Sequence, residues 1–237
     1  MKTNVKFGGG VKFLFILSCV LNVLFITHAI KRKIEIKQYK DHPKPSQAIV
    51  GWTNTISKLN LKADIAFFGN SITRNSSFHE YYPDKRIINL GCGGDRIEDM
   101  LIRMQMLKAV HADKIFLMAG INGSKNLDLE DFQKKYNLLI DSIQINNPES
   151  QLYVQSILPL SKGKENTEHY ADNATIQKMN LIIKSICQAR NIPFIDLYSL
   201  YCIDGYLPLE YTRNDGIHIK DNYYKIWSDK IRQYIYE

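Results

Sequence analysis

The sequence has few cysteines, and they show none of the spacings typical of a metal site or a disulfide framework. It contains four cysteines in 237 residues. Cys92, Cys187 and Cys202 follow the N-terminal region at unrelated spacings, with no Cys-x-x-Cys pair. Zinc sites need clustered ligands, and disulfide frameworks need paired cysteines. The cysteines therefore indicate neither.

The sequence also lacks a glycine-rich phosphate loop, a metal-ligand cluster and a nucleic-acid-binding motif. Its formal net charge of +7 is misleading, because residues 1–45 alone carry nine basic and two acidic residues. The remaining 22 basic and 22 acidic residues cancel. The positive charge thus belongs to the N-terminal tail, and a nucleic-acid partner is not indicated.

Long apolar runs are confined to the N-terminus. Residues 1–12 form a basic segment, and residues 13–30 are 18 residues without a charge. As a helix they would extend about 27 Å, which is close to the thickness of a hydrocarbon core. We therefore predict a transmembrane signal anchor at residues 13–30. A cleaved signal peptide is the alternative, although Thr27-His28-Ala29 is a poor cleavage site.

Residues 31–45 are polar and basic, contain Pro43 and Pro45, and are predicted to be a juxtamembrane linker. Five basic residues between Lys31 and Lys40 favour a cytoplasmic flank, because basic flanks tend to stay inside. A signal-like position and a large following domain favour export. We expect a single-pass membrane protein whose catalytic domain lies outside the cytoplasm, in the cell envelope.

Residues 46–237 are expected to form one domain, in which short apolar runs alternate with longer amphipathic segments. Runs that are apolar throughout are typical of strands covered on both faces. Five such units with right-handed crossovers predict a flavodoxin-like three-layer α/β/α sandwich with a five-stranded parallel sheet. The predicted strands are residues 64–69, 86–90, 114–120, 151–157 and 193–197.

The segments between the strands repeat apolar residues at helical spacing, and these residues are expected in the core. The first predicted helix spans Asp95–Val110. The predicted buried faces are Ile97, Leu101, Met104 and Leu107; Phe132, Tyr136, Leu139 and Ile143; Ile176, Met179, Ile183 and Ile186; and Tyr223, Ile226, Ile231 and Tyr234.

Sites in open parallel sheets lie at the carboxyl ends of the strands, so the residues after each strand are the candidates for chemistry. Ser71 follows the first strand in Gly-Asn-Ser-Ile-Thr. Gly94 follows the second in Gly-Cys-Gly-Gly-Asp, where glycines leave backbone N–H groups accessible. Each block alone could be only a turn with a helix cap, Asp95 being the cap in the second.

Two further blocks complete the candidate set. Asn122 places a side-chain amide after the third strand, in Gly-Ile-Asn-Gly. Near the C-terminus, Asp215 and His218 stand three residues apart in Asn-Asp-Gly-Ile-His. That spacing lets the carboxylate accept from one imidazole nitrogen while the other faces outward, as a base that activates a hydroxyl requires.

The four blocks, in this order and at these strand ends, resemble the SGNH hydrolases, also called the GDSL family, over residues 64 to 237. The resemblance implies that Ser71 attacks an ester carbonyl and that His218, oriented by Asp215, is the base. It implies an oxyanion hole formed by the Ser71 N–H, the Gly94 N–H and the Asn122 side-chain amide. Such chemistry requires no metal and no organic cofactor.

The sequence departs from the family pattern at two positions. Asn70 replaces the aspartate that usually precedes the serine, but a short polar side chain can still brace the turn. Gly123 replaces the aspartate that usually follows the oxyanion asparagine. The Asn122 amide is therefore kept, and the carboxylate that usually follows it is absent.

The resemblance favours a serine esterase acting on small acyl esters, O-acetyl groups on carbohydrate in particular. Relatives with the Gly-Asn-Ser-Ile-Thr form look like acetylesterases and platelet-activating-factor acetylhydrolase-like enzymes. The alternatives are a membrane-associated lysophospholipase or acyltransferase, and a carbohydrate-binding relative without turnover. The partners expected are therefore an acyl ester or acetylated carbohydrate as substrate and, through the N-terminal helix, a membrane.

Overall fold

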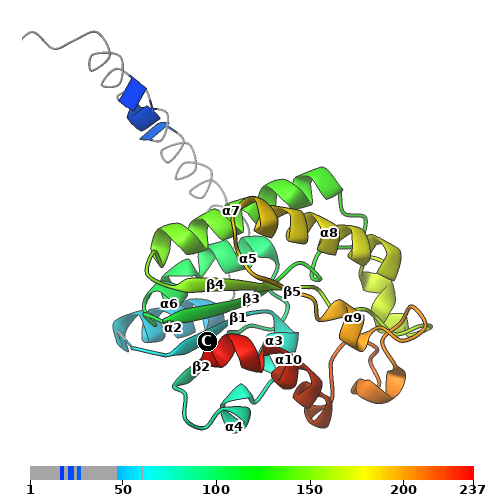
Figure 1. Ribbon diagram of the computed structural model, residues 1–237. Coiled ribbons are helices and arrows are strands. Elements are labelled where there is room, and N and C mark those ends of the chain that lie inside the picture. The colour runs from blue at the N-terminus through cyan, green and yellow to red at the C-terminus, as the bar shows by residue number, and fades with distance from the viewer. Residues whose placement is uncertain (1–16, 19–20, 24–25, 28–46, 60) are drawn as a thin grey trace, which may run out of the picture.

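The computed structural model describes residues 17–18, 21–23, 26–27, 47–59 and 61–237. Its centre is a sheet of five parallel strands in the order β2-β1-β3-β4-β5 (Figure 1). The strands are β1 (Ile65–Gly69), β2 (Ile87–Gly91), β3 (Lys114–Met118), β4 (Gln151–Gln155) and β5 (Phe194–Ile195). This strand order is that of flavodoxin-like folds. The predicted five-stranded parallel sheet is confirmed.

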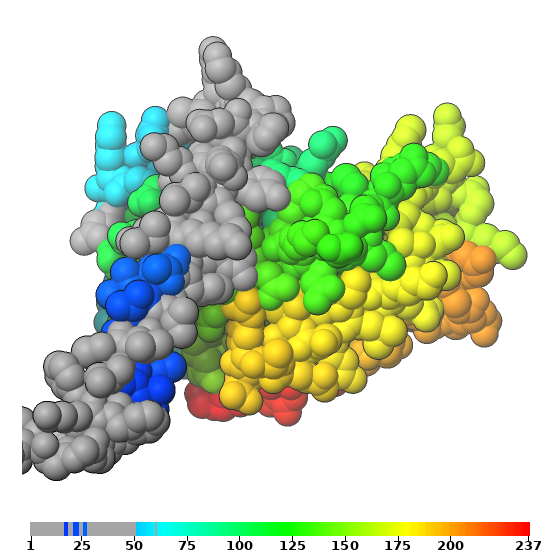
Figure 2. Space-filling model, turned by 90° about the horizontal axis from the view of Figure 1, so that it is seen from above, coloured from blue at the N-terminus to red at the C-terminus, as the bar shows by residue number. Residues whose placement is uncertain are grey.

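Helices cover both faces of the sheet (Figure 1). One face carries α5 (Ile97–Ile102), α6 (Met104–Lys108), α7 (Leu129–Asn146) and α8 (Asn173–Ala189). The other carries α3 (Ser71–Arg74), α4 (Phe78–Tyr81) and α10 (Tyr224–Tyr236). α2 (Gln47–Leu59) packs beside α6, and α9 (Tyr198–Tyr201) follows β5. In Figure 2, α7 and α8 lie side by side across the upper face.

The two long helices begin where the sequence supplies a capping carboxylate. Asp128 accepts a hydrogen bond from the backbone N–H of Asp131 at the start of α7, and Asp172 accepts from Thr175 N–H at the start of α8. Such caps satisfy donors that the first helical turn leaves unpaired. The apolar faces predicted for both helices are buried.

The predicted helix over residues 95–110 is wrong in one respect, because it is broken into α5 and α6 at Arg103. Arg103 leaves helical geometry at φ −93° and ψ 20°, and its side chain is fully buried. Its guanidinium donates to backbone oxygens at the ends of β1 and β2, and the break turns the side chain inward to reach them.

The closing helix also differs from the prediction in its buried face. Tyr224, Trp227, Ile231 and Ile235 are buried, whereas Tyr223, Ile226 and Tyr234 are only partly buried. Trp227 fixes this rotation, because its indole N–H donates to the Gln155 side chain at 2.5 Å in the core.

The predicted anchor, residues 13–30, lies mostly outside the described residues, as do the segments 1–12 and 31–45. The parts described, residues 17–18, 21–23 and 26–27, are helical and exposed. Across the described part of the chain, no helix has the length and apolar character that crossing a membrane requires.

Candidate active site

Ser71 is the first residue of α3, directly after β1. The preceding Asn70 is almost completely buried, and its side-chain oxygen accepts the backbone N–H of Ile72 at 2.9 Å. Asn70 therefore braces the turn, as predicted for the replacement of the usual aspartate. The cap holds the Ser71 hydroxyl at the carboxyl edge of the sheet.

Three predicted residues from distant parts of the sequence meet at this edge. His218 Nε2 lies 2.8 Å from Ser71 Oγ, and His218 Nδ1 lies 2.6 Å from Asp215 Oδ2. The hydroxyl, the imidazole and the carboxylate thus form one continuous chain of hydrogen bonds. A serine so placed can transfer its proton to the imidazole while it attacks a carbonyl carbon.

The loop that carries Asp215 and His218 is held by its own backbone. Asp215 Oδ1 accepts the N–H groups of Ile217 and His218, each at 2.9 Å. Between them Gly216 has φ +79°, a left-handed conformation that favours glycine, and its carbonyl accepts from Ser161 N–H at 2.9 Å. The carboxylate therefore faces the imidazole in a defined orientation.

The same contacts set the charge of Asp215. Burial alone would raise its pKa, but the N–H groups of His218 and Ile217 and the His218 side chain outweigh burial and lower the pKa below the ordinary value of 3.8. A carboxylate that accepts several hydrogen bonds stays ionised. Asp215 is thus a negative group that can orient His218 and stabilise its protonated form.

Two predicted donors lie on the neighbouring loops. Gly94 is exposed with φ +80°, and no residue of the described chain accepts its backbone N–H. Asn122 donates one amide hydrogen to the carbonyl of Asp95 at 2.8 Å, which fixes the plane of the amide. Because an amide carries two hydrogens, the second remains available to a ligand oxygen.

A buried ion pair behind these loops escaped sequence reasoning. Arg103 Nε lies 2.5 Å from Asp95 Oδ2, and both side chains are almost completely buried. Burial raises the pKa of the Asp95 carboxyl, and the guanidinium of Arg103 opposes that rise. Asp95 is therefore not the helix cap that the sequence suggested; Arg96 precedes α5, and Asp99 accepts its backbone N–H. The sequence did contain one indication of this ion pair. Arg103 is a charged residue between Leu101 and Met104, in a segment whose predicted inner face is otherwise apolar.

Cys92 lies two residues before Gly94, and its thiol is half-buried. Burial raises the pKa of its thiol to about 11, with the neighbouring Asp95 adding to the effect. Since the thiolate is the reactive form, the raised pKa disfavours a nucleophilic role for this thiol at neutral pH. In the described part of the chain no group of three histidine, cysteine or acidic residues could hold a metal ion.

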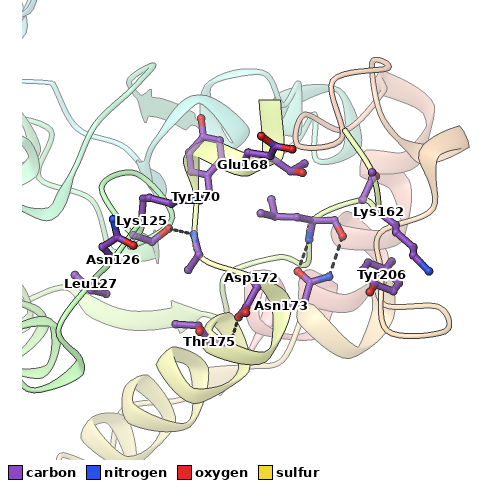
Figure 3. A pocket seen from close by; sticks show the side chains of 16 residues that line it. Lys125, Asn126, Leu127, Lys162, Glu168, Tyr170, Asp172, Asn173, Thr175 and Tyr206 are labelled. Carbon is purple, nitrogen blue, oxygen red and sulfur yellow. Dashed lines mark hydrogen bonds between the residues drawn. The ribbon is translucent and has the colours of Figure 1, made fainter. Parts of the chain in front are cut away.

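A cavity of about 520 Å³ lies beside the loops that carry Asn122 and the pair Asp215 and His218. Figure 3 shows its labelled walls, which come from the turn after β3, from the loop between β4 and α8, from the first turn of α8, and from Tyr206. Ser124 on the first wall is two residues beyond Asn122, and Thr167 on the second packs against Gly216. The cavity thus lies against two of the loops that carry candidate residues.

The family model described as GDSL-like Lipase/Acylhydrolase matches residues 67–226. A protein from Streptococcus pneumonia described as a platelet activating factor is 25% identical, with a TM-score of 0.70 over 78% of this chain and 92% of that one. An acetyl xylan esterase shares the fold at 21% identity and a TM-score of 0.57, over 73% of this chain and 99% of that one.

The curated relatives are longer proteins. N-acylneuraminate cytidylyltransferase of Streptococcus agalactiae serotype V is 22% identical over 228 residues, which cover 90% of this chain and 47% of the relative. The chain therefore spans about half the length of the curated relatives it matches.

Proposed function

Because the chain belongs to the GDSL-like lipase/acylhydrolase family, we propose that it is an ester-hydrolysing enzyme that works through an acyl-enzyme on Ser71. His218 takes the hydroxyl proton as Ser71 attacks the ester carbonyl, and then gives that proton to the departing alcohol. Water, activated by the same imidazole, hydrolyses the acyl-serine and restores the enzyme. The observation that carries this proposal is the unbroken chain from Ser71 Oγ through His218 to Asp215.

The negative charge that develops on the carbonyl oxygen needs donors. We assign this role to the Ser71 N–H, the Gly94 N–H and the free hydrogen of the Asn122 amide. Donors fixed before the reaction stabilise the tetrahedral intermediate without reorganisation. The bond from Asn122 to the Asp95 carbonyl supports the assignment, because it holds the amide in one orientation.

Asn122→Ala tests the oxyanion role. It should lower kcat by about a hundredfold to a thousandfold with KM little changed, as expected for the loss of one oxyanion donor. Asn122→Asp should do no better, because a carboxylate repels the developing charge. Steady-state kinetics with p-nitrophenyl acetate measures both. Near-normal turnover in either variant would reduce Asn122 to a turn residue.

For the substrate we propose a small acyl group, acetyl in particular, esterified to a carbohydrate. The related acetyl xylan esterase is named for an acetylated polysaccharide, and the curated relatives for N-acylneuraminate, a carboxylated sugar. The polar lining of the cavity beside the site agrees with such an alcohol portion.

A chain-length series tests the acyl preference. Purified protein should hydrolyse p-nitrophenyl acetate with a higher kcat/KM than the butyrate, and the octanoate and palmitate much more slowly. A preference for long chains, together with hydrolysis of a lysophospholipid, would instead support the lysophospholipase. Formation of a new ester in the presence of an acceptor alcohol would support the acyltransferase alternative. Absence of all turnover would support a carbohydrate-binding relative without catalytic activity.

We also propose that residues 13–30 tether the enzyme to a membrane and that its domain faces the cell envelope. Trp52 and Ile56 of α2 pack against the core, so the folded domain reaches back to this helix. Residues 1–45 carry the whole excess of positive charge and none of the proposed site. An anchor would then raise the local concentration of enzyme near its substrate without altering the chemical step.

Deletion of residues 1–45 should give a protein that is soluble without detergent and retains the full-length kcat/KM on p-nitrophenyl acetate. A matched deletion of residues 1–60 removes α2 as well and should lower the melting temperature. Aggregation or a large loss of activity in the shorter deletion would show that the N-terminal segment packs on the domain.

A further inference from the structure

The cavity beside the site is lined mainly by polar groups. Hydroxyls, amides, lysines, carboxylates and two tyrosine rings make up most of its lining, with few aliphatic side chains. Its volume of about 520 Å³ falls within the range of small-molecule sites, roughly 300–1,000 Å³. A pocket for a fatty acyl chain would need apolar walls, so this cavity suits a polyhydroxylated ligand.

Two walls of the cavity adjoin loops that carry residues of the proposed reaction centre. Ser124 N–H donates to the Ile121 carbonyl and closes the turn that carries Asn122. On the opposite wall, a β-carbon placed on Gly216 would lie 2.9 Å from the Thr167 methyl group. The cavity therefore has the oxyanion loop on one side and, on the other, a segment that packs against the loop of Asp215 and His218.

Hydrogen bonds within the protein hold the walls of the cavity in place. Ser124 Oγ accepts the N–H of Ala171 at 2.9 Å, and Asn173 bonds both the N–H and the carbonyl of Leu160. Rigid walls reduce the entropy lost on binding.

Lys125 and Lys162 of the cavity lining are exposed, and within the described chain neither forms an ion pair with a carboxylate. The ammonium of Lys162 lies 5.5 Å from the centre of the Tyr206 ring (Figure 3).

We propose that this cavity binds the sugar on the alcohol side of the scissile ester, with the Tyr206 ring as a stacking surface and the nearby polar groups as hydrogen-bond partners. The proposal rests on the proposed esterase function and adds the place where the carbohydrate is recognised. Tyrosine suits this role because its ring is a rigid, amphipathic surface.

The test compares esters with and without a sugar. Acetylated xylo-oligosaccharide and O-acetylated N-acetylneuraminate serve as neutral and acidic sugar probes, and p-nitrophenyl acetate and ethyl acetate as esters without one. In the unmodified full-length protein, at least one sugar probe should have a kcat/KM about tenfold or more above ethyl acetate. Tyr206→Ala should raise KM for that probe by about five- to tenfold, in keeping with an aromatic contact. The same variant should keep kcat/KM for p-nitrophenyl acetate within about twofold of the unmodified protein.

Ile203→Ala is the matched control, since Ile203 is exposed on the same hairpin but does not line the cavity. Ile203→Ala should change the kinetic constants for neither the sugar probe nor p-nitrophenyl acetate. Equal effects of Tyr206→Ala on both substrates, or none on either, would overturn the sugar site, as would a preference for ethyl acetate over both sugar probes. None of these results touches the esterase proposal, which the hydrolysis of p-nitrophenyl acetate tests separately.

A different observation leads to a second inference, which concerns the buried Arg103. Its guanidinium donates to the Gly69 carbonyl at 2.9 Å and to the Leu90 carbonyl at 2.7 Å, besides the Asp95 carboxylate. The guanidinium also lies 4.4 Å from the centre of the Phe68 ring. One side chain thus joins the carboxyl ends of β1 and β2 to the loop that follows β2.

We infer that Arg103 and Asp95 are positioning residues for the oxyanion hole. Gly69 lies two residues before Ser71, Gly94 lies directly before Asp95, and the Asp95 carbonyl holds the Asn122 amide. The ion pair therefore sets the relative positions of all three proposed donors, although neither residue touches the substrate. A misplacement of about 1 Å at a reacting centre can cost about a hundredfold in rate.

Arg103→Lys is the most informative variant, because it keeps a positive charge beside Asp95 but cannot reach all three acceptors at once. It should lower kcat by about ten- to a hundredfold, with KM for p-nitrophenyl acetate within about threefold. Its affinity for an alkyl boronic acid, which forms a tetrahedral adduct with the serine, should fall in parallel with kcat. Rates are expressed per folded enzyme, from circular dichroism.

Leu107→Ala controls for stability, because Leu107 is fully buried on α6 and is not one of the proposed donors. It should lower the melting temperature and leave kcat and boronate affinity unchanged. The positioning role is overturned if Arg103→Lys keeps full kcat and boronate affinity, or if Leu107→Ala loses as much of both as Arg103→Lys does.

Discussion

Ser71→Ala should lower ester hydrolysis by about 10⁴- to 10⁶-fold, the range seen when a serine hydrolase loses its nucleophile. The hydroxyl is the only part of the side chain that this change removes. Because Ser71 Oγ lies 2.8 Å from His218 Nε2, no acyl-enzyme can form without it. The variant should fold normally, since the turn is held by Asn70 and not by the hydroxyl.

Two assays check this result. p-Nitrophenyl acetate hydrolysis should fall to the background rate, and labelling by a fluorophosphonate probe should disappear. Ser199→Ala is a suitable control, because Ser199 is an exposed serine of α9 whose hydroxyl donates to Asp196. It should keep both activity and labelling. Labelling of Ser71→Ala at another serine would assign the nucleophile elsewhere.

Asp215→Asn should lower kcat by about 10⁴-fold while the loop keeps its shape. The amide oxygen of asparagine can still accept the two backbone N–H groups that Asp215 Oδ1 binds. Its NH₂ group would then face His218 Nδ1, which lies 2.6 Å from Asp215 Oδ2. That contact would place the imidazole proton on Nε2, where it faces Ser71 and cannot accept the serine proton.

The same variant separates catalysis from stability. The lowered pKa of Asp215 stabilises the fold at pH values well above 3.8, and this contribution is lost as pH falls below 3.8 through the lowered pKa. Asp215→Asn should therefore unfold at a slightly lower temperature than the unmodified protein at pH 7, and the difference should vanish in strong acid. An activity loss of less than about tenfold at pH 7 would contradict the assigned role of the carboxylate.

The sheet was predictable from sequence because its strands are buried on both faces. Runs such as Asp64–Gly69 and Lys114–Gly120 are apolar almost throughout, and few other structures bury such short segments completely. The carboxyl-edge rule then singled out Ser71 and Asn122, and the Asp-His spacing near the C-terminus, with the family resemblance, added His218.

The features that sequence reasoning missed depend on contacts between distant residues. Periodicity treats residues 95–110 as one helix, and only the acceptors on β1 and β2 explain why the chain breaks at Arg103. In the same way, the indole of Trp227 selects the buried face of the last helix through a bond to β4. The cavity is built from three separated segments, none of which carries a motif of its own.

Rapid-quench mass spectrometry of the intact protein mixed with p-nitrophenyl acetate tests the central claim most directly. If Ser71 forms an acyl-enzyme, a species heavier by one acetyl group should appear within the first turnover, map to the peptide containing Ser71, and decay at the steady-state rate. Asp215→Asn should form it more slowly, and Ser71→Ala should not form it. Acetate release without any acetylated protein, or an acetyl group on a different residue that decays at the turnover rate, would contradict the account.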